Sequence, residues 1–232
     1  MKILAIDTAT EACSVALING DVKDVIFEIC PQQHSQRILP MIDKLLSKHA
    51  IKITDLDALA YCRGPGSFTG VRIATGIVQG LALGADLPVI EVSTLAAMAQ
   101  ENYMQHGYRI TKVLIDARMQ EVYFGHFRVH NGIVAELQCE AVLTPTEAVA
   151  KFAEISHDNE AFGRAGTGWA AYKEALLTSQ NTDPINVLYP CAEFILPIAE
   201  QAFKDGNTIT VDDVTPIYLR DKVTWKKLPS KK

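Results

Sequence analysis

The chain has 232 residues, of which 48% are hydrophobic and 21% are charged, and its formal net charge is −5. This composition is typical of a globular protein with a sizeable core, and the acidic balance argues against nucleic-acid binding over the whole surface. Five cysteines without a CxxC pair predict a reducing compartment, no disulfide framework and no zinc site. An acid at Asp7 follows the first apolar stretch and no apolar run approaches ~20 residues, so we expect a cytoplasmic protein without signal peptide or membrane span.

The first half of the chain alternates strand-like and helix-like patterns. Asn19 and Gly20 separate two apolar runs and predict a hairpin. In chain order we expect strands at 2–6, 12–18 and 22–29, a helix at 37–49, a strand at 56–62, a glycine-rich loop with a second helix, a strand at 88–92 and a helix at 94–106.

The helix at 37–49 is predicted to be amphipathic. Pro40 is tolerated in the first turn of a helix, which sets the predicted start near residue 36 or 37. Its apolar stripe is a candidate surface for a partner chain, and packing in the core is the alternative. The stripe consists of Ile38, Met41, Ile42 and Leu45.

The glycine-rich stretch RGPGSFTGVRIATGIVQG runs from Arg63 to Gly80. It is not a Walker A loop, because Gly66 and Gly70 lie too close and no lysine follows, and it lacks the GxSxG pattern of a nucleophile elbow. Ser67 or Thr69 is expected to cap the following helix. The loop is interpreted either as a phosphate contact at a helix N-terminus or as a tight strand-to-helix turn.

Four residues are candidates for a phosphate site, if the first interpretation holds. An acid at the end of a first strand handles a metal–nucleotide complex in kinase-like folds, and a turn or cap residue is the alternative. The candidates are Asp7, Thr8, Gly66 and Ser67.

The helix behind the loop has no charged residue from Ile73 to Ala85. Each glycine inside a helix costs about 1 kcal/mol relative to alanine, so the three glycines four residues apart require a compensating contact. A helix that is apolar on all sides is buried on all sides, either in the core or against a partner chain. The candidate partner-binding residues on this helix are Arg72, Ile73, Gly76, Ile77 and Gly80.

The second half of the chain repeats the pattern of the first. Residues 113–134 share four features with residues 4–22, in the same order: an apolar run ending in Ile-Asp, a turn, a strand and an Asn-Gly turn. A duplicated unit predicts a two-lobed α/β protein. We expect an N-terminal lobe at 1–105 and a smaller, degenerate lobe at 106–232 that ends in a basic tail. Asp7 and Arg118, each next to an Ile-Asp turn, are expected to meet between the lobes.

Six stretches together resemble the TsaB (YeaZ) family: ILAIDTATEACSVAL, HSQRILPMI, RGPGSFTGVR, PVIEVSTLAAMA, IDARMQEVY and YLRDKVTWKKLP. The resemblance covers nearly the whole chain and implies the fold of the actin, sugar-kinase and acetate-kinase group. It also implies a paralogue of the catalytic subunit TsaD, which carries an HxxxH metal site. Thr94 and Met98 stand where those histidines are expected, and a hydroxyl and a thioether cannot replace two imidazoles. We therefore expect no metal, no cofactor and no catalytic residue.

The resemblance implies a non-catalytic scaffold or dimerisation subunit. The complex would transfer the threonylcarbamoyl group from threonylcarbamoyl-AMP to N6 of the tRNA adenosine next to the anticodon. The implied partners are TsaD, the ATPase TsaE and, through the complex, tRNA, with a homodimer possible for the free chain. The alternatives are a stand-alone ATP-dependent phosphotransferase, which needs a working acid at Asp7, and a metallopeptidase, which needs the missing histidines.

Overall fold

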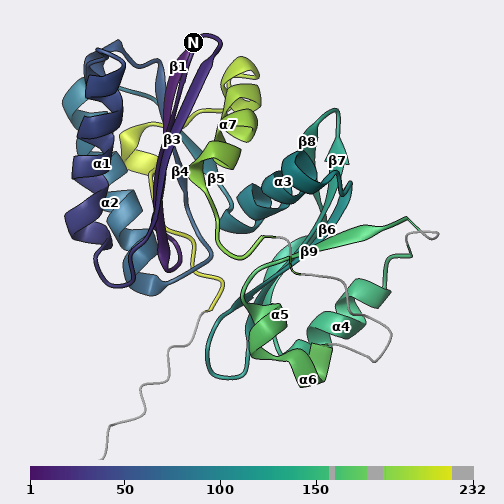
Figure 1. Ribbon diagram of the computed structural model, residues 1–232. Coiled ribbons are helices and arrows are strands. Elements are labelled where there is room, and N and C mark those ends of the chain that lie inside the picture. The colour runs from purple at the N-terminus through teal and green to yellow at the C-terminus, as the bar shows by residue number, and fades with distance from the viewer. Residues whose placement is uncertain (157–159, 177–184, 186, 221–232) are drawn as a thin grey trace, which may run out of the picture.

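The protein is described by a computed structural model that covers residues 1–156, 160–176, 185 and 187–220 (Figure 1). Each of its two lobes is built around one sheet. The first lobe contains β1 (Lys2–Asp7), β2 (Ala12–Asn19), β3 (Val22–Ile29), α1 (His34–Lys48), β4 (Ala58–Cys62), α2 (Phe68–Ala85) and β5 (Val89–Val92), and α3 (Thr94–His106) follows. The second contains β6 (Ile110–Asp116), β7 (Val122–His130), β8 (Ile133–Leu143), α4 (Pro145–Ala153), β9 (Phe162–Ala165), α5 (Gly168–Ala171) and α6 (Lys173–Leu176), and α7 (Ile195–Lys204) follows.

The two sheets share one topology. Their strand orders are β3-β2-β1-β4-β5 and β8-β7-β6-β9. The first strand of each unit pairs antiparallel with the second strand and parallel with the strand that follows the first helix. The duplicated unit predicted from the repeated Ile-Asp and Asn-Gly patterns is therefore present in the fold.

Helices cover both faces of each sheet (Figure 1). Side by side, α1 and α2 pack on one face of the first sheet, and α7 packs on the other. Between the lobes, α3 packs on the second sheet through Leu95, Met98 and Ala99. The outer face of the second sheet is covered by α4 and the short helices after β9, around Phe152 and Trp169.

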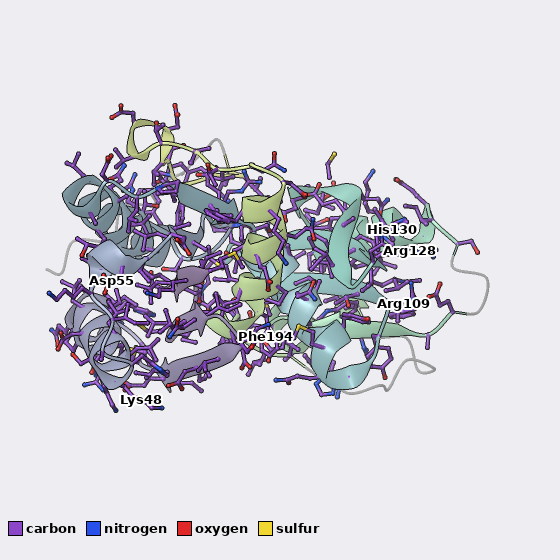
Figure 2. All side chains as sticks on the ribbon, turned by 90° about the horizontal axis from the view of Figure 1, so that it is seen from above. Lys48, Asp55, Arg109, Arg128, His130 and Phe194 are labelled. Atoms are coloured by element: carbon purple, nitrogen blue, oxygen red, sulfur yellow. The ribbon has the colours of Figure 1, made fainter. Side chains whose placement is uncertain are left out.

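The C-terminal part of the second predicted lobe belongs to the first sheet. In α7, Ile195, Leu196 and Ala199 are fully buried in the cluster that covers this sheet, and Val89 of β5 pairs with Ile209. Seen from above, α7 lies between the side of Lys48 and Asp55 and the side of Arg109, Arg128 and His130 (Figure 2). The lobe bounds 1–105 and 106–232 remain a prediction, and the packing of α7 and Ile209 on the first sheet argues against assigning all later residues to the second lobe. The basic tail after Arg220 lies outside the described residues.

The predicted partner stripe on α1 is buried inside this chain. Its four residues, Ile38, Met41, Ile42 and Leu45, are at most 4% exposed and pack in the first-lobe core. This corrects their assignment to an interface, because a sheet of the same chain already covers them. The helix also begins at His34, two or three residues earlier than predicted, so that Pro40 lies inside it on the exposed side. At an exposed position, water can donate a hydrogen bond to the backbone carbonyl that proline leaves unpaired.

Two leucines of α1 provide a matched test of this correction. Leu45 is fully buried, whereas Leu39 is 51% exposed. We predict that Leu45→Ala lowers the free energy of unfolding by about 2–5 kcal/mol, because it leaves a core cavity. Leu39→Ala should change it by less than about 0.5 kcal/mol. Urea unfolding of the two variants measures the difference. Equally small effects would contradict burial of the stripe in the core and support the original interface assignment.

Candidate functional site

A cleft of about 1090 Å³ lies between the lobes. Three segments of the first lobe line it: the β1–β2 loop from Ala9, the segment before α1, and the start of α2. The second lobe contributes the end of β6 and the loop after it, and Ile217–Arg220 close one side. The corresponding hairpin loops of the two duplicated units thus face each other across the cleft, which makes it the main candidate site.

The acid at the end of β1 is not open to this cleft. Asp7 is fully buried and does not line the cavity. Its Oδ1 accepts a hydrogen bond from the Ala9 N–H at 3.2 Å, and its Oδ2 has no partner among the residues that the structure describes. Desolvation raises the pKa of Asp7 to about 7, and the nearby Cys62 thiol and the Ala9 N–H act against this effect.

Two glycines of the glycine-rich loop bring its backbone against this strand end. A Cβ on Gly66 would lie 2.3 Å from the Ala9 carbonyl oxygen, and one on Gly70 would lie 2.0 Å from the Thr8 carbonyl oxygen. The Thr8 hydroxyl donates to the Gly70 carbonyl at 2.6 Å, and the Ser67 N–H donates to the Ala9 carbonyl at 2.7 Å. These contacts favour the interpretation of the loop as a tight strand-to-helix turn.

The four predicted phosphate-site residues are divided by this packing. Asp7 and Thr8 are fully buried, with the Thr8 hydroxyl bonded to Gly70, whereas Gly66 and Ser67 line the cleft. Of the two predicted caps, Ser67 precedes α2 and its hydroxyl accepts from the Gly70 N–H at 3.4 Å. The acid and the loop therefore do not act on one ligand from the cleft in this arrangement.

Across the cleft, Arg118 meets Glu11. The Arg118 guanidinium lies 3.6 Å from the Glu11 carboxylate and 2.9 Å from Asp116 of its own loop. This corrects the predicted contact with Asp7: Asp7 is fully buried and does not line the cleft, whereas Glu11, in the turn that follows, does. Since Arg118 is 76% exposed, the pair contributes little stability. A second link is the Tyr123 hydroxyl, which donates to the Gly66 carbonyl at 3.3 Å.

A cluster of an arginine and two aromatic rings at the cleft was not predicted. The Arg72 guanidinium lies 3.5 Å from the centroid of the Phe68 ring, and its Nε donates to the Tyr218 hydroxyl at 2.6 Å. The residue types of positions 68 and 72 are visible at one-turn spacing in the sequence. The third member comes from 146 positions later in the chain, and no local pattern indicates it.

The glycine ridge of α2 points away from the core. At Gly76, Gly80 and Gly84 a Cβ would meet no atom within 4 Å. Beside them, Leu83 is 73% exposed, while Ile73 and Ile77 are half-buried against the first-lobe core. By length and composition alone, α2 could cross a membrane, yet one side of it packs on the first sheet and 33% of its residues are buried.

The positions corresponding to the expected histidine pair are part of the core. Thr94 and Met98 in α3 are fully buried, and Met98 packs in the cluster beside the second sheet. Within the described parts of the chain, no group of three or more His, Cys, Asp or Glu side chains could hold a metal ion.

Similarity to known proteins shows the family of this chain. The family model described as "TsaD: tRNA N6-adenosine threonylcarbamoyltransferase" matches residues 21–225. A relative from Escherichia coli, named tRNA threonylcarbamoyladenosine biosynthesis protein TsaB, is 50% identical over 236 residues, which cover 100% of both chains. The chain belongs to the TsaB family. A TsaB relative from Haemophilus influenzae is 44% identical and covers 100% of this chain and 98% of its own.

Solved structures of the TsaB family agree with the fold. The structure titled "YeaZ from Pseudomonas aeruginosa" has a TM-score of 0.82 and 39% identity, covering 94% of this chain and 100% of that one. A second Pseudomonas aeruginosa structure, titled as an uncharacterized protein with similarity to peptidase YEAZ, has a TM-score of 0.85 and 38% identity, covering 94% and 99%. The predicted two-lobed α/β fold is confirmed.

Two Gly→Ala substitutions in α2 test the packing of the loop. Gly70→Ala should lower the free energy of unfolding by on the order of 1–3 kcal/mol or more, because its Cβ would overlap the Thr8 carbonyl oxygen. Gly76→Ala should raise it by about 0.5–1 kcal/mol, because the site is open and alanine is the better helix former. Thermal melts of both variants check the opposite signs, and two changes of the same sign would contradict the close approach.

The buried carboxyl of Asp7 should impose a pH dependence on stability. Its pKa is raised from 3.8 to about 7 in the folded chain, so between these values the folded state binds more protons than the unfolded state. The contribution of Asp7 to stability therefore falls as the pH rises from about 4 to 7, by up to about 1.4 kcal/mol per pH unit. Asp7→Asn should remove that decline. Unfolding curves at several pH values compare the two chains, and parallel pH profiles would contradict a buried carboxyl.

Proposed function

We propose that this chain is a non-catalytic subunit of the cytoplasmic machinery that makes threonylcarbamoyladenosine in tRNA. The names of its full-length relatives support the pathway. The non-catalytic role is supported by two features of the site. The strand-end acid Asp7 is fully buried and does not line the cleft, and a threonine and a methionine occupy the positions of the expected histidine pair. The chain acts by holding its partners in position.

The observation that carries this proposal is the open glycine ridge of α2. Three glycines one turn apart lower the surface of the helix, so that another helix can approach its backbone closely. Leu83 supplies exposed apolar area beside them, and Arg72 supplies a charge at one end of the same side. Glycines at solvent-exposed helix positions lower helix stability without packing in the monomer, which a partner helix would offset.

The partner proposed for this ridge is a chain of the TsaD type. The family model that carries the TsaD name matches residues 21–225 of this chain, so such a partner shares its fold and brings an equivalent helix. The interface comprises Arg72, Ile73, Gly76, Ile77 and Gly80, extended by the exposed Leu39 of the neighbouring α1. In the absence of TsaD, the same surface would pair two copies of this chain. The ATPase TsaE and tRNA act with the resulting complex.

A reconstituted reaction separates this role from an enzyme with its own activity. We expect that threonylcarbamoyl-AMP and tRNA yield modified adenosine only when this chain and a TsaD subunit are both present. This chain alone should transfer nothing to tRNA and hydrolyse neither ATP nor peptides. Transfer by this chain alone would overturn the proposal in favour of an enzyme. Full activity of TsaD without it would overturn the scaffold role.

A bulky residue on the ridge should remove binding while leaving the fold intact. Gly80→Leu places a side chain where the isolated chain has open space, so its melting temperature should stay within about 2 °C of the parent. Capture of TsaD and self-association should both be lost, together with modification activity. Gln201→Leu, at an exposed position of α7, is the matched control and should retain all three. Intact capture by the Gly80 variant would place the interface elsewhere.

A further inference from the structure

The N-termini of α1 and α2 lie on two sides of one loop at the cleft. The Ser67 N–H at the start of α2 donates to the Ala9 carbonyl at 2.7 Å. The Cys30 N–H, shortly before α1, donates to the Glu11 carbonyl at 3.0 Å. Neither helix has an acidic residue in its first turn, and the residue before α1, Gln33, makes no capping hydrogen bond with its side chain. Both positive helix ends therefore lack a carboxylate from their own first turn.

A buried histidine lines the cleft from the α1 side. His34 is the first residue of α1, is 8% exposed and contributes to the cavity wall. Its Nε2 is buried and has no hydrogen-bond partner within the ranges that the structure covers. A buried polar nitrogen without a partner is unfavourable, so a group in the cleft that accepts a hydrogen bond would satisfy it.

An arginine and two rings line the cleft from the α2 side. The bond from Arg72 to the Tyr218 hydroxyl uses Nε, so its terminal nitrogens can serve a ligand, and no carboxylate pairs with it in the described ranges. Phe68 and Tyr218 are 49% and 42% exposed, and their ring centroids are 5.5 Å apart. The carboxylates that line the cleft, Glu11 and Asp116, are both engaged by Arg118.

We propose that this part of the cleft binds the phosphate group of a nucleotide. His34 Nε2, the Arg72 guanidinium and the N–H groups of the first two residues of α1 and α2 donate to the phosphate oxygens, and the rings of Phe68 and Tyr218 stack on the base. The site uses neither the acid at the end of β1 nor a metal. The phosphate comes either from RNA or from a free mononucleotide. The RNA source rests on the proposed function, whereas the phosphate site itself does not.

The test uses the isolated full chain and three probes: inorganic phosphate, AMP, and an RNA stem-loop of anticodon-arm sequence. AMP should bind saturably and more tightly than inorganic phosphate, because only AMP carries a base. Affinity for AMP should fall at least tenfold in His34→Phe and in Arg72→Gln. Arg109→Gln, which removes an arginine that does not line the cleft, should leave it unchanged (Figure 2).

Competition between the probes identifies the source of the phosphate. Displacement of AMP by the stem-loop supports RNA, and persistence of AMP supports a mononucleotide. No AMP binding at millimolar concentration, or unchanged binding in both cleft variants, overturns the site. If a variant does not fold, NMR of the parent chain decides: AMP should shift the His34 ring and Arg72 Nε signals, and unmoved signals overturn the site. Because no partner chain is present, this result is independent of the reconstituted modification reaction.

Discussion

The architecture of the first lobe depends on one close backbone contact. Gly66 in the loop before α2 and Gly70 in its first turn lie so close to the Ala9 and Thr8 carbonyls that an added Cβ would overlap them. This contact fixes where α2 begins and which side of it meets the first sheet. Val71, Ala74, Val78 and Ala82 then point inward, and the glycines four residues apart point outward. The carboxyl of Asp7, at the end of β1, is fully buried and does not line the cleft.

The two ends of the glycine-rich stretch at 63–80 therefore have different roles. Its N-terminal part packs on the backbone just after β1, where a nucleotide-handling fold would expose an acid. That acid, Asp7, is buried here, which supports the proposal that the chain does not catalyse a reaction. Its C-terminal part is a helix that is apolar on the solvent side, which supports a partner surface. The cleft remains open between the two hairpin loops, with the pair of Glu11 and Arg118 across it. Scaffold and ligand-binding roles are therefore compatible in one chain.

Local patterns predicted the elements well but not what covers them. The hairpins, the duplicated order and the bounds of α3 follow from alternation, Asn-Gly turns and capping residues. An apolar stripe such as that of α1 looks the same whether its own sheet or another chain covers it, and here the sheet covers it. The return of α7 to the first sheet depends on contacts far apart in the chain, as does the position of Tyr218. The choice of Glu11 over Asp7 for Arg118 depends on which side of a turn faces the cleft.

The outer side of α2 is the surface that we propose a partner covers. Four native cysteines are buried and Cys139 is exposed, so Cys139 serves as an internal reference thiol. In a Gly80→Cys variant, both exposed thiols should be alkylated rapidly in the free chain. On addition of a TsaD subunit, the rate at position 80 should fall at least tenfold while the rate at Cys139 stays the same. An unchanged alkylation rate at position 80 in a complex that demonstrably forms would contradict a partner surface on the outer side of α2.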